Sequence, residues 1–203
     1  MSIQSGQPVF ASDMNSMVPI GVPLPFFGSV AYLPTDHLIC DGSTIGDASS
    51  GATARANADT QTLFALLWNS IANTELTLQD SSGSPTTRGA SASADFAAHK
   101  RMPLPDMRGY TIGGYKSGDP TFGTLGKQAG EAAHTLTTTE LPAHHHGGLP
   151  SSTSTSYGGV MGGQSYYTPS GGGNTSDVGS NTPHNNIQPT ITINWIMRYR
   201  SYA

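Results

Sequence analysis

The chain has 203 residues, a formal net charge of −4, and charged side chains at only 11% of positions, against about 25% in typical soluble domains. It contains nine Lys and Arg residues without a basic cluster, which argues against binding to nucleic acid. The single cysteine, Cys40, excludes a disulfide within the chain and a cysteine-rich zinc site. We find no apolar run of 18 or more residues and no secretory signal pattern, so we predict no membrane span and synthesis in the cytoplasm.

The 25 Gly and 14 Pro residues, with abundant Ser and Thr, are typical of turns. This composition predicts a mainly β protein with long irregular loops. Because only 35% of residues are hydrophobic, a large core within one chain is not expected. Burial between subunits would compensate for that deficit.

The first part of the chain divides into an arm and an extended segment. Residues 1–17 mix small and polar residues with Met14 and Met17, and we interpret them as a tether. Residues 18–28 alternate Pro and Gly with apolar residues, which excludes a helix and favours extended backbone. We expect short strands at 30–32 and at 37–40, the second closed by an Asp41-Gly42 turn.

One short helix is predicted, at about 61–72, with Asp59 or Thr60 as its cap. Leu63, Leu67 and Ile71 follow i, i+4 spacing and predict a core-facing stripe.

Three polar stretches are interpreted as loops. Residues 43–58 and 79–98 are rich in small polar side chains, and the second is expected to be an exposed insertion. Residues 111–130 contain six glycines and few apolar residues. Between these stretches, Asp106 and Arg108 suit a local ion pair.

The C-terminal segment 187–198 predicts the clearest strand. Ile191, Ile193, Trp195 and Met197 alternate with Thr192, Asn194 and Arg198, the period of a half-buried strand. A short capped turn is expected at 137–142, before Pro142.

Three consecutive histidines follow that turn. In extended backbone His144 and His146 point to one face and His145 to the other. Two imidazoles do not complete a first-row metal site, which takes four or more ligands. Three chains around an axis would supply six nitrogens; alternatively His134 or His184 completes a site within one chain, or the run is a solvated turn.

Residues 147–183 combine ten glycines with one charge, Asp177. Tyr157, Tyr166 and Tyr167 lie among Ser, Gly and Asn, a composition also found in recognition loops. The segment is therefore a candidate receptor-binding loop, and the alternative is a structural loop or flexible linker.

Several segments together resemble the phage tail collar family and the receptor-binding tips of phage short tail fibres. The matching segments are Pro19-Ile20-Gly21, 38–43, 63–68, Met102-Pro103-Leu104-Pro105-Asp106-Met107-Arg108-Gly109, His134-Thr135-Leu136-Thr137, 140–146 and 184–190. They occur in the family's order within roughly 18–78, 101–146 and 184–198. The departures are His37, where the family usually has Trp, the long link 79–98, and the lack of a preceding shaft repeat.

The resemblance implies a collar-like module that forms an intertwined parallel homotrimer. Its implied domains are 18–130, with the insertion 79–98, and a metal-binding and head region 131–203. It also implies one structural divalent metal ion per trimer, bound by His144 and His146. Six nitrogens would favour iron or nickel over zinc, which is usually tetrahedral in structural sites.

The function implied is that of a virion protein at the tail tip or baseplate that mediates host attachment. Expected partners are other tail proteins, through the arm, and a host-surface glycan or outer-membrane receptor. A connector that binds only virion proteins is the alternative. A polysaccharide depolymerase is less favoured, because no catalytic motif occurs and the sequence does not pair two carboxylates.

Overall fold

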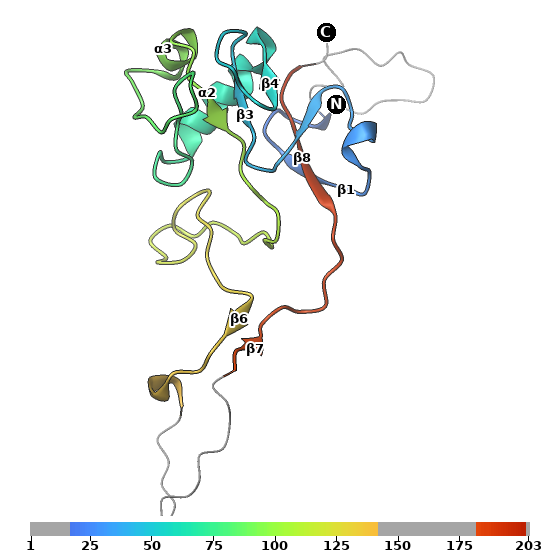
Figure 1. Ribbon diagram of the computed structural model, residues 1–203, viewed down its shortest axis with the longest axis vertical. Coiled ribbons are helices and arrows are strands. Elements are labelled where there is room, and N and C mark those ends of the chain that lie inside the picture. The colour runs from blue at the N-terminus through green and yellow to red at the C-terminus, as the bar shows by residue number, and fades with distance from the viewer. Residues whose placement is uncertain (1–16, 142–181, 202–203) are drawn as a thin grey trace, which may run out of the picture. The chain divides into compact units, whose positions relative to one another are not determined.

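The computed structural model describes residues 17–141 and 182–201. Of these, 17–130 and 190–201 form one compact unit, called here the large unit, and 131–141 with 182–189 form the small unit. Both consist mainly of short strands and irregular segments (Figure 1). The mainly β class with long loops is therefore confirmed.

The first sheet of the large unit joins the two ends of the described chain. Strand β8 (Asn194–Arg198) lies between β1 (Pro23–Phe26) and β2 (His37–Ile39) and is antiparallel to both. The expected extended segment 18–28 is thus confirmed at 23–26, after a turn at 20–21, and the expected strand at 37–40 is confirmed at 37–39. Their pairing with β8 places the C-terminal strand at the centre of the sheet (Figure 1).

The second sheet corrects the prediction that residues 43–58 form a loop. Strand β3 (Thr44–Gly46) lies between β4 (Arg55–Ala56), which is parallel to it, and β5 (Met102–Pro103), which is antiparallel. The backbone N–H of Thr44 and that of Thr53 each donate to the other residue's hydroxyl at 2.9 Å. These hydrogen bonds satisfy the polar groups of a strand that is buried. The small polar residues of this segment therefore gave no sign that it contains a buried strand.

Helix α2 (Gln61–Ser70) is shorter than the predicted 61–72, because Ile71 is already extended. Thr60 occupies the N-cap position without a capping bond. Its hydroxyl instead donates to the carbonyl oxygens of Gly46 and Asn57. The side chain of Asn57 caps the preceding 3-10 turn η2 (Ala58–Thr60), so the chain enters α2 without a break.

A second helix, α3 (Ala92–Ala97), lies within the predicted insertion. Its N-cap Ser91 accepts a hydrogen bond from the Ala94 N–H at 3.1 Å, and Asp95 and Phe96 are buried. The predictions of one helix and of a wholly exposed segment 79–98 are therefore wrong. Short polar residues dominate the segment, and a single aromatic side chain anchors it to the core.

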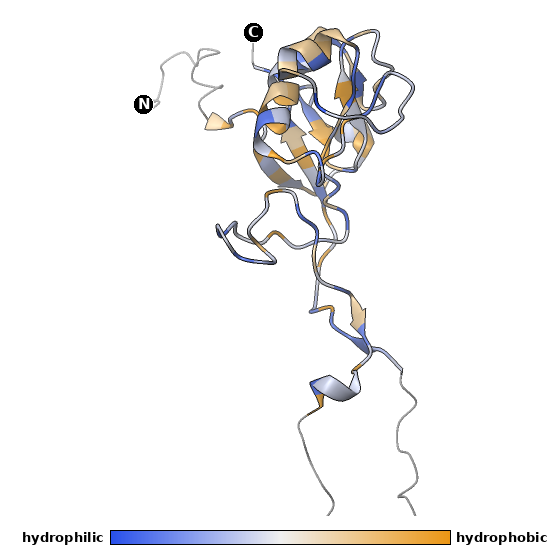
Figure 2. Ribbon diagram, turned by 90° about the vertical axis from the view of Figure 1, so that its left-hand side faces the viewer, coloured by the Kyte–Doolittle hydropathy of each residue, from blue (hydrophilic) through white to orange (hydrophobic). Residues whose placement is uncertain are grey.

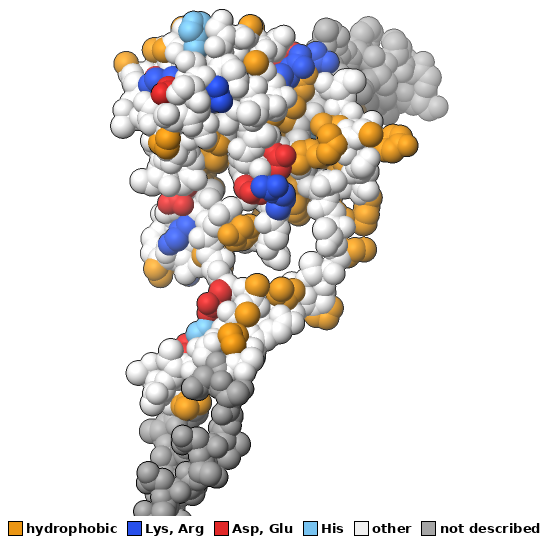
Figure 3. Space-filling model, in the orientation of Figure 1, with side chains coloured by type: hydrophobic (Ala, Val, Ile, Leu, Met, Phe, Trp, Pro, Cys, Tyr) orange, Lys and Arg blue, Asp and Glu red, His pale blue; other side chains and the backbone are white. Residues whose placement is uncertain are grey.

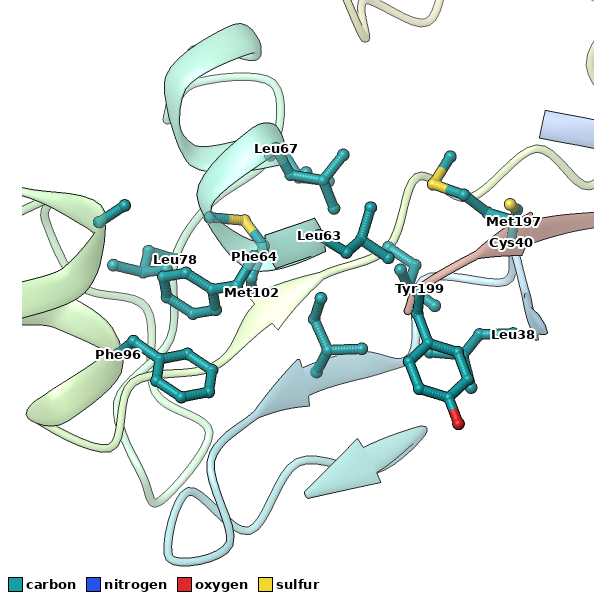
Figure 4. Packing of buried hydrophobic residues seen from close by; sticks show 14 residues of the cluster. Leu38, Cys40, Leu63, Phe64, Leu67, Leu78, Phe96, Met102, Met197 and Tyr199 are labelled. Carbon is teal, nitrogen blue, oxygen red and sulfur yellow. The ribbon is translucent and has the colours of Figure 1, made fainter. Parts of the chain in front are cut away.

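The core of the large unit lies between α2, α3 and both sheets (Figure 4). Figure 2 shows hydrophobic colour concentrated in the helices and strands of this unit. Phe64 and Phe96 pack edge to face, with ring centroids 5.2 Å apart, a favourable aromatic geometry. The buried apolar side chains that pack into this core are Leu38, Cys40, Ile45, Leu63, Phe64, Leu67, Leu76, Leu78, Ala92, Phe96, Met102, Leu104, Met197 and Tyr199.

The C-terminal strand departs from the predicted alternation. Strand β8 begins only at Asn194, and Ile191 is 74% exposed. Arg198, expected on the polar face, is fully buried. Its guanidinium reaches Asp36, with 3.4 Å between Nε and Oδ2, and donates to the Val18 carbonyl. A buried charge is tolerated when it is paired in this way. Contrary to the prediction from the alternation, Arg198 therefore does not lie on a solvent-exposed face of the strand.

Residues 30–32, predicted as a strand, form the 3-10 turn η1 (Val30–Tyr32). The N–H of Tyr32 donates to the Ser29 carbonyl at 2.9 Å, and that of Leu33 to the Val30 carbonyl at 3.2 Å. No residue of the turn is buried. No strand in the described part of the chain pairs with it, and these local hydrogen bonds take the place of a sheet.

The small unit contains β6 (Ala133–His134), β7 (His184–Asn185) and the 3-10 turn η3 (Thr138–Glu140). Strands β6 and β7 are antiparallel. The expected capped turn is confirmed, because Thr137 and Glu140 form a capping box. In the described part of the chain, no helix has the length and apolar character needed to cross a membrane.

Candidate functional site

The small unit pairs two histidines that are distant in sequence. His134 and His184 are directly opposite each other in the β6–β7 ladder. Their rings meet edge to face, with centroids 5.7 Å apart and an angle of 87°. The N–H of Asn186 extends the ladder by donating to the Ala132 carbonyl at 2.9 Å. Residues 132–134 and 184–186, which lie on either side of residues 142–181 in the sequence, are thus hydrogen-bonded to each other.

Both ring nitrogens of His134 face carboxylates. Nδ1 contacts Glu131, and Nε2 lies 2.9 Å from Oε1 of Glu140. An ionised carboxylate only accepts hydrogen bonds, so the arrangement requires the imidazolium form, in which both nitrogens donate. Hydrogen bonds to Glu140 and then Glu131 raise the pKa of His134 above its usual value.

Glu140 links this histidine to the turn η3. Its Oε2 accepts hydrogen bonds from the Thr137 N–H at 2.6 Å and the Thr137 hydroxyl at 2.8 Å. These bonds, followed by the one from His134, lower the pKa of Glu140 to about 2. Since charge-assisted hydrogen bonds hold both ends of the turn, β6 and η3 form one ordered element.

The geometry bears on the alternatives for a metal site. The predicted ligands His144 and His146 lie outside the described residues. Among residues 17–141 and 182–201 no group of three or more His, Cys, Asp or Glu side chains is arranged to hold a metal ion. His134 would have to break a charge-assisted hydrogen bond to become a ligand. This disfavours a single-chain site completed by His134, whereas the site shared by three chains stays a prediction.

The candidate receptor-binding residues Tyr157, Tyr166 and Tyr167 also lie outside the described residues. Asp106 and Arg108 are described, and the expected local ion pair is confirmed. Arg108 donates from Nε and Nη2 to the two carboxylate oxygens at 2.8 and 2.7 Å. The pair is exposed and lowers the pKa of Asp106 chiefly through these hydrogen bonds. The Arg108 N–H also donates to Oδ1 of Asp106 at 3.1 Å, so the pair lies within one local turn.

A groove of about 990 Å³ in the large unit was not predicted. One wall is the C-terminal half of α2, and the other comes from the irregular segment after β5. Tyr110, Tyr115 and Phe122 contribute aromatic rings to it. These rings occur at irregular spacing among glycines, so no period of a helix or strand identified them. The only signal was large apolar residues in a segment that otherwise looked like a solvated loop.

Comparison with models of known protein families and with curated proteins found no match. A solved structure, the C24 protein from the Antarctic microorganism Bizionia argentinensis, is similar at 14% sequence identity with a TM-score of 0.36. The match covers 95% of this chain and 63% of that protein, so the chain spans under two thirds of its length. A similarity this low assigns neither fold nor function.

Proposed function

We propose that the chain is a non-enzymatic structural protein of a phage virion, located at the tail tip or baseplate, that attaches the particle to the host surface. The observation that carries this proposal is the set of motifs, in the order found in the tail collar family. They run from Pro19-Ile20-Gly21 through the Pro105-to-Gly109 signature to His184-Asn185-Asn186. Each motif is short, and their combination is specific.

The folded positions of three of the matching segments support the proposal. The segments 134–137 and 184–190 are far apart in sequence, yet His134 and His184 are cross-strand partners. Segment 38–43 likewise begins in β2, which pairs with the C-terminal strand β8. Motifs that recur together in a family are expected to meet in space when they build one module.

In the proposed assembly three copies share one divalent metal ion through His144 and His146. Bound there, the ion would link chains, so binding free energy would become assembly free energy. Neutral imidazole suits iron, nickel and zinc. The tyrosines Tyr157, Tyr166 and Tyr167 would contact a host glycan or outer-membrane receptor, because aromatic rings combine apolar and hydrogen-bonding surface.

The test is competition for adsorption. Purified protein should bind host cells and reduce adsorption of the corresponding virions, and a variant that lacks residues 150–182 should do neither. Adsorption that survives this deletion would contradict the head assignment. Presence in virions without binding to cells would identify a connector instead, and release of reducing sugar from host polysaccharide would identify an enzyme.

A further inference from the structure

The groove of the large unit is mainly apolar, and no described part of the unit covers it. Five large side chains of the segment after β5, each about half exposed, face water at or near it: Tyr110, Ile112, Tyr115, Phe122 and Leu125. A soluble protein rarely leaves such a group of apolar side chains exposed unless a partner covers it.

Internal hydrogen bonds fix the segment that presents these side chains. Oδ1 of Asp119 accepts from the N–H groups of Thr121 and Phe122 at 2.9 and 3.0 Å. The amide of Gln128 donates to the Asp106 carbonyl at 2.8 Å. Gly126, at φ +80°, lies so close to Ile71, the residue that follows α2, that a Cβ atom would be 2.8 Å from the Ile71 side chain. The rim is therefore preformed.

The same unit carries an apolar projection away from this groove. It consists of η1 and the preceding turn, with Phe27, Val30 and Tyr32 at 76%, 67% and 79% exposure. Asn194 of β8 holds the projection by donating to the Gly28 carbonyl at 2.8 Å. Figure 3 shows hydrophobic side chains standing out on the β1 side of the unit, while Figure 1 places η1 apart from the segment after β5.

The projection has no charged side chain, and few line the groove: Glu75, Asp106 and Lys127. Residues 17–35, which include the projection, contain no charged side chain, and neither do 109–115 or 120–126 in the groove segment. Loss of charged residues distinguishes the core of a protein interface from ordinary surface. The uncharged turn and the uncharged aromatic stretches 109–115 and 120–126 are therefore each expected to be covered.

We propose that these two surfaces bind each other between copies of the chain: the projection Phe27–Tyr32 of one copy enters the groove of the next. A concave and a convex surface at separate places on one unit make a heterologous contact, which closes into a ring when the rotation allows it. A different partner would require only one of the two surfaces. The inference rests on the self-association in the proposed function, and is independent of the metal ion and of host attachment.

The available area is sufficient. A fully exposed aromatic side chain presents about 200 Å², so the two aromatic rings of the projection and the three of the groove each leave roughly 300 Å² in water. The exposed parts of Val30, Ile112 and Leu125 add roughly another 300 Å², so the exposed apolar area of the two surfaces together is roughly 900 Å². Since about 57% of a typical interface is apolar, this matches the standard total of about 1,600 Å².

The test uses two complementary variants of the full chain. Phe27→Ser/Tyr32→Ser removes the projection, and Tyr115→Ser/Phe122→Ser removes the groove rings. Ile191→Ser, equally exposed but outside both surfaces, is the matched control. All the substituted side chains are at least half exposed, so circular dichroism should show each variant folded. Sedimentation velocity measures the assembly of each protein and of a one-to-one mixture.

We expect the wild type and the control to form the same closed oligomer, and each double variant to be a monomer at micromolar concentration. A mixture of the two double variants should yield a dimer and nothing larger, because each retains one intact surface. An oligomer that persists in both double variants would contradict the proposed contact between projection and groove, but not the proposed homotrimer. A monomeric wild type would contradict both the contact and the homotrimer. Loss of host binding by the groove variant without loss of assembly would make the groove a receptor site instead.

Discussion

The indole Nε1–H of Trp68 donates a hydrogen bond to Oδ2 of Asp95 at 2.8 Å, which joins α2 to α3. The same carboxylate accepts from the Gly89 N–H at 2.8 Å and pairs with the Lys100 ammonium at 2.7 Å. Asp95 is buried. A buried carboxylate with three donors is well satisfied, and those donors lose their acceptor if it is removed.

Replacement Asp95→Ala should therefore lower the free energy of unfolding by about 3 kcal/mol, the cost of breaking a buried charged pair. Urea denaturation followed by tryptophan fluorescence measures it. Ser93→Ala, on the exposed side of the same helix, is the control and should change stability by less than about 0.5 kcal/mol. Equal stability of both variants would show that the link between the helices does not stabilise the fold.

Acid should remove this contribution. Burial acts to raise the pKa of Asp95, but hydrogen bonds from Lys100, Gly89 and Trp68 outweigh it, so the pKa in the folded protein is lowered. A lowered folded pKa means that the stabilisation is complete above the unfolded value of about 3.9 and is lost as pH falls through the folded value. The stability difference between wild type and Asp95→Ala should shrink below about pH 4. A constant difference across this range would contradict the assignment.

Segment 79–98 shows where sequence patterns lose information. Its composition is that of a loop, yet Phe96 ties it to the core by packing against Phe64. Asp95 also looks like a surface residue until Trp68 and Lys100, distant in sequence, are placed beside it. In contrast, the capped turn at 137–140 was predictable, because its partners Thr137 and Glu140 lie within one local pattern.

The candidate site also combines features that the sequence predicts with features that it does not. The histidine run and the carboxylates near it are visible in the sequence, but the pairing of His134 with His184 depends on a ladder between distant segments. The groove depends on the backbone path of a segment without period, which brings Tyr110 and Phe122 opposite α2. Periodicity detects regular elements, so surfaces built by irregular segments escape it.

Glu140→Gln should shift the titration of His134. The pKa of His134 is raised mainly by its hydrogen bond to Glu140, so the variant should titrate at lower pH in an NMR experiment. Because the pKa of His134 is raised in the folded protein, the hydrogen bonds of protonated His134 stabilise the fold fully at pH values below the unfolded pKa of about 6.5. This stabilisation is lost as pH rises through the folded pKa. Glu75→Gln, in the large unit, is the control. An unchanged His134 titration in Glu140→Gln would contradict the contact.

Cys40 should be unreactive in the folded protein. Its side chain is buried, and burial, aided by the nearby Asp41 carboxylate, raises its pKa to about 12. Because the thiolate is the reactive form, a thiol reagent at pH 8 should modify it only after denaturation. The unfolded chain in guanidinium serves as the positive control, and rapid labelling under native conditions would show that the core opens next to β2.

Native mass spectrometry of the full chain, with and without a chelator and combined with elemental analysis, tests most directly whether three copies share one metal ion. The expected species is a trimer with one iron, nickel or zinc ion, and the metal should be absent from the His144→Ala/His146→Ala variant. His134→Ala should keep the metal, which separates the shared site from a site within one chain. A metal-free monomer would contradict the proposed assembly, and a metal-bound monomer would place the site in a single chain.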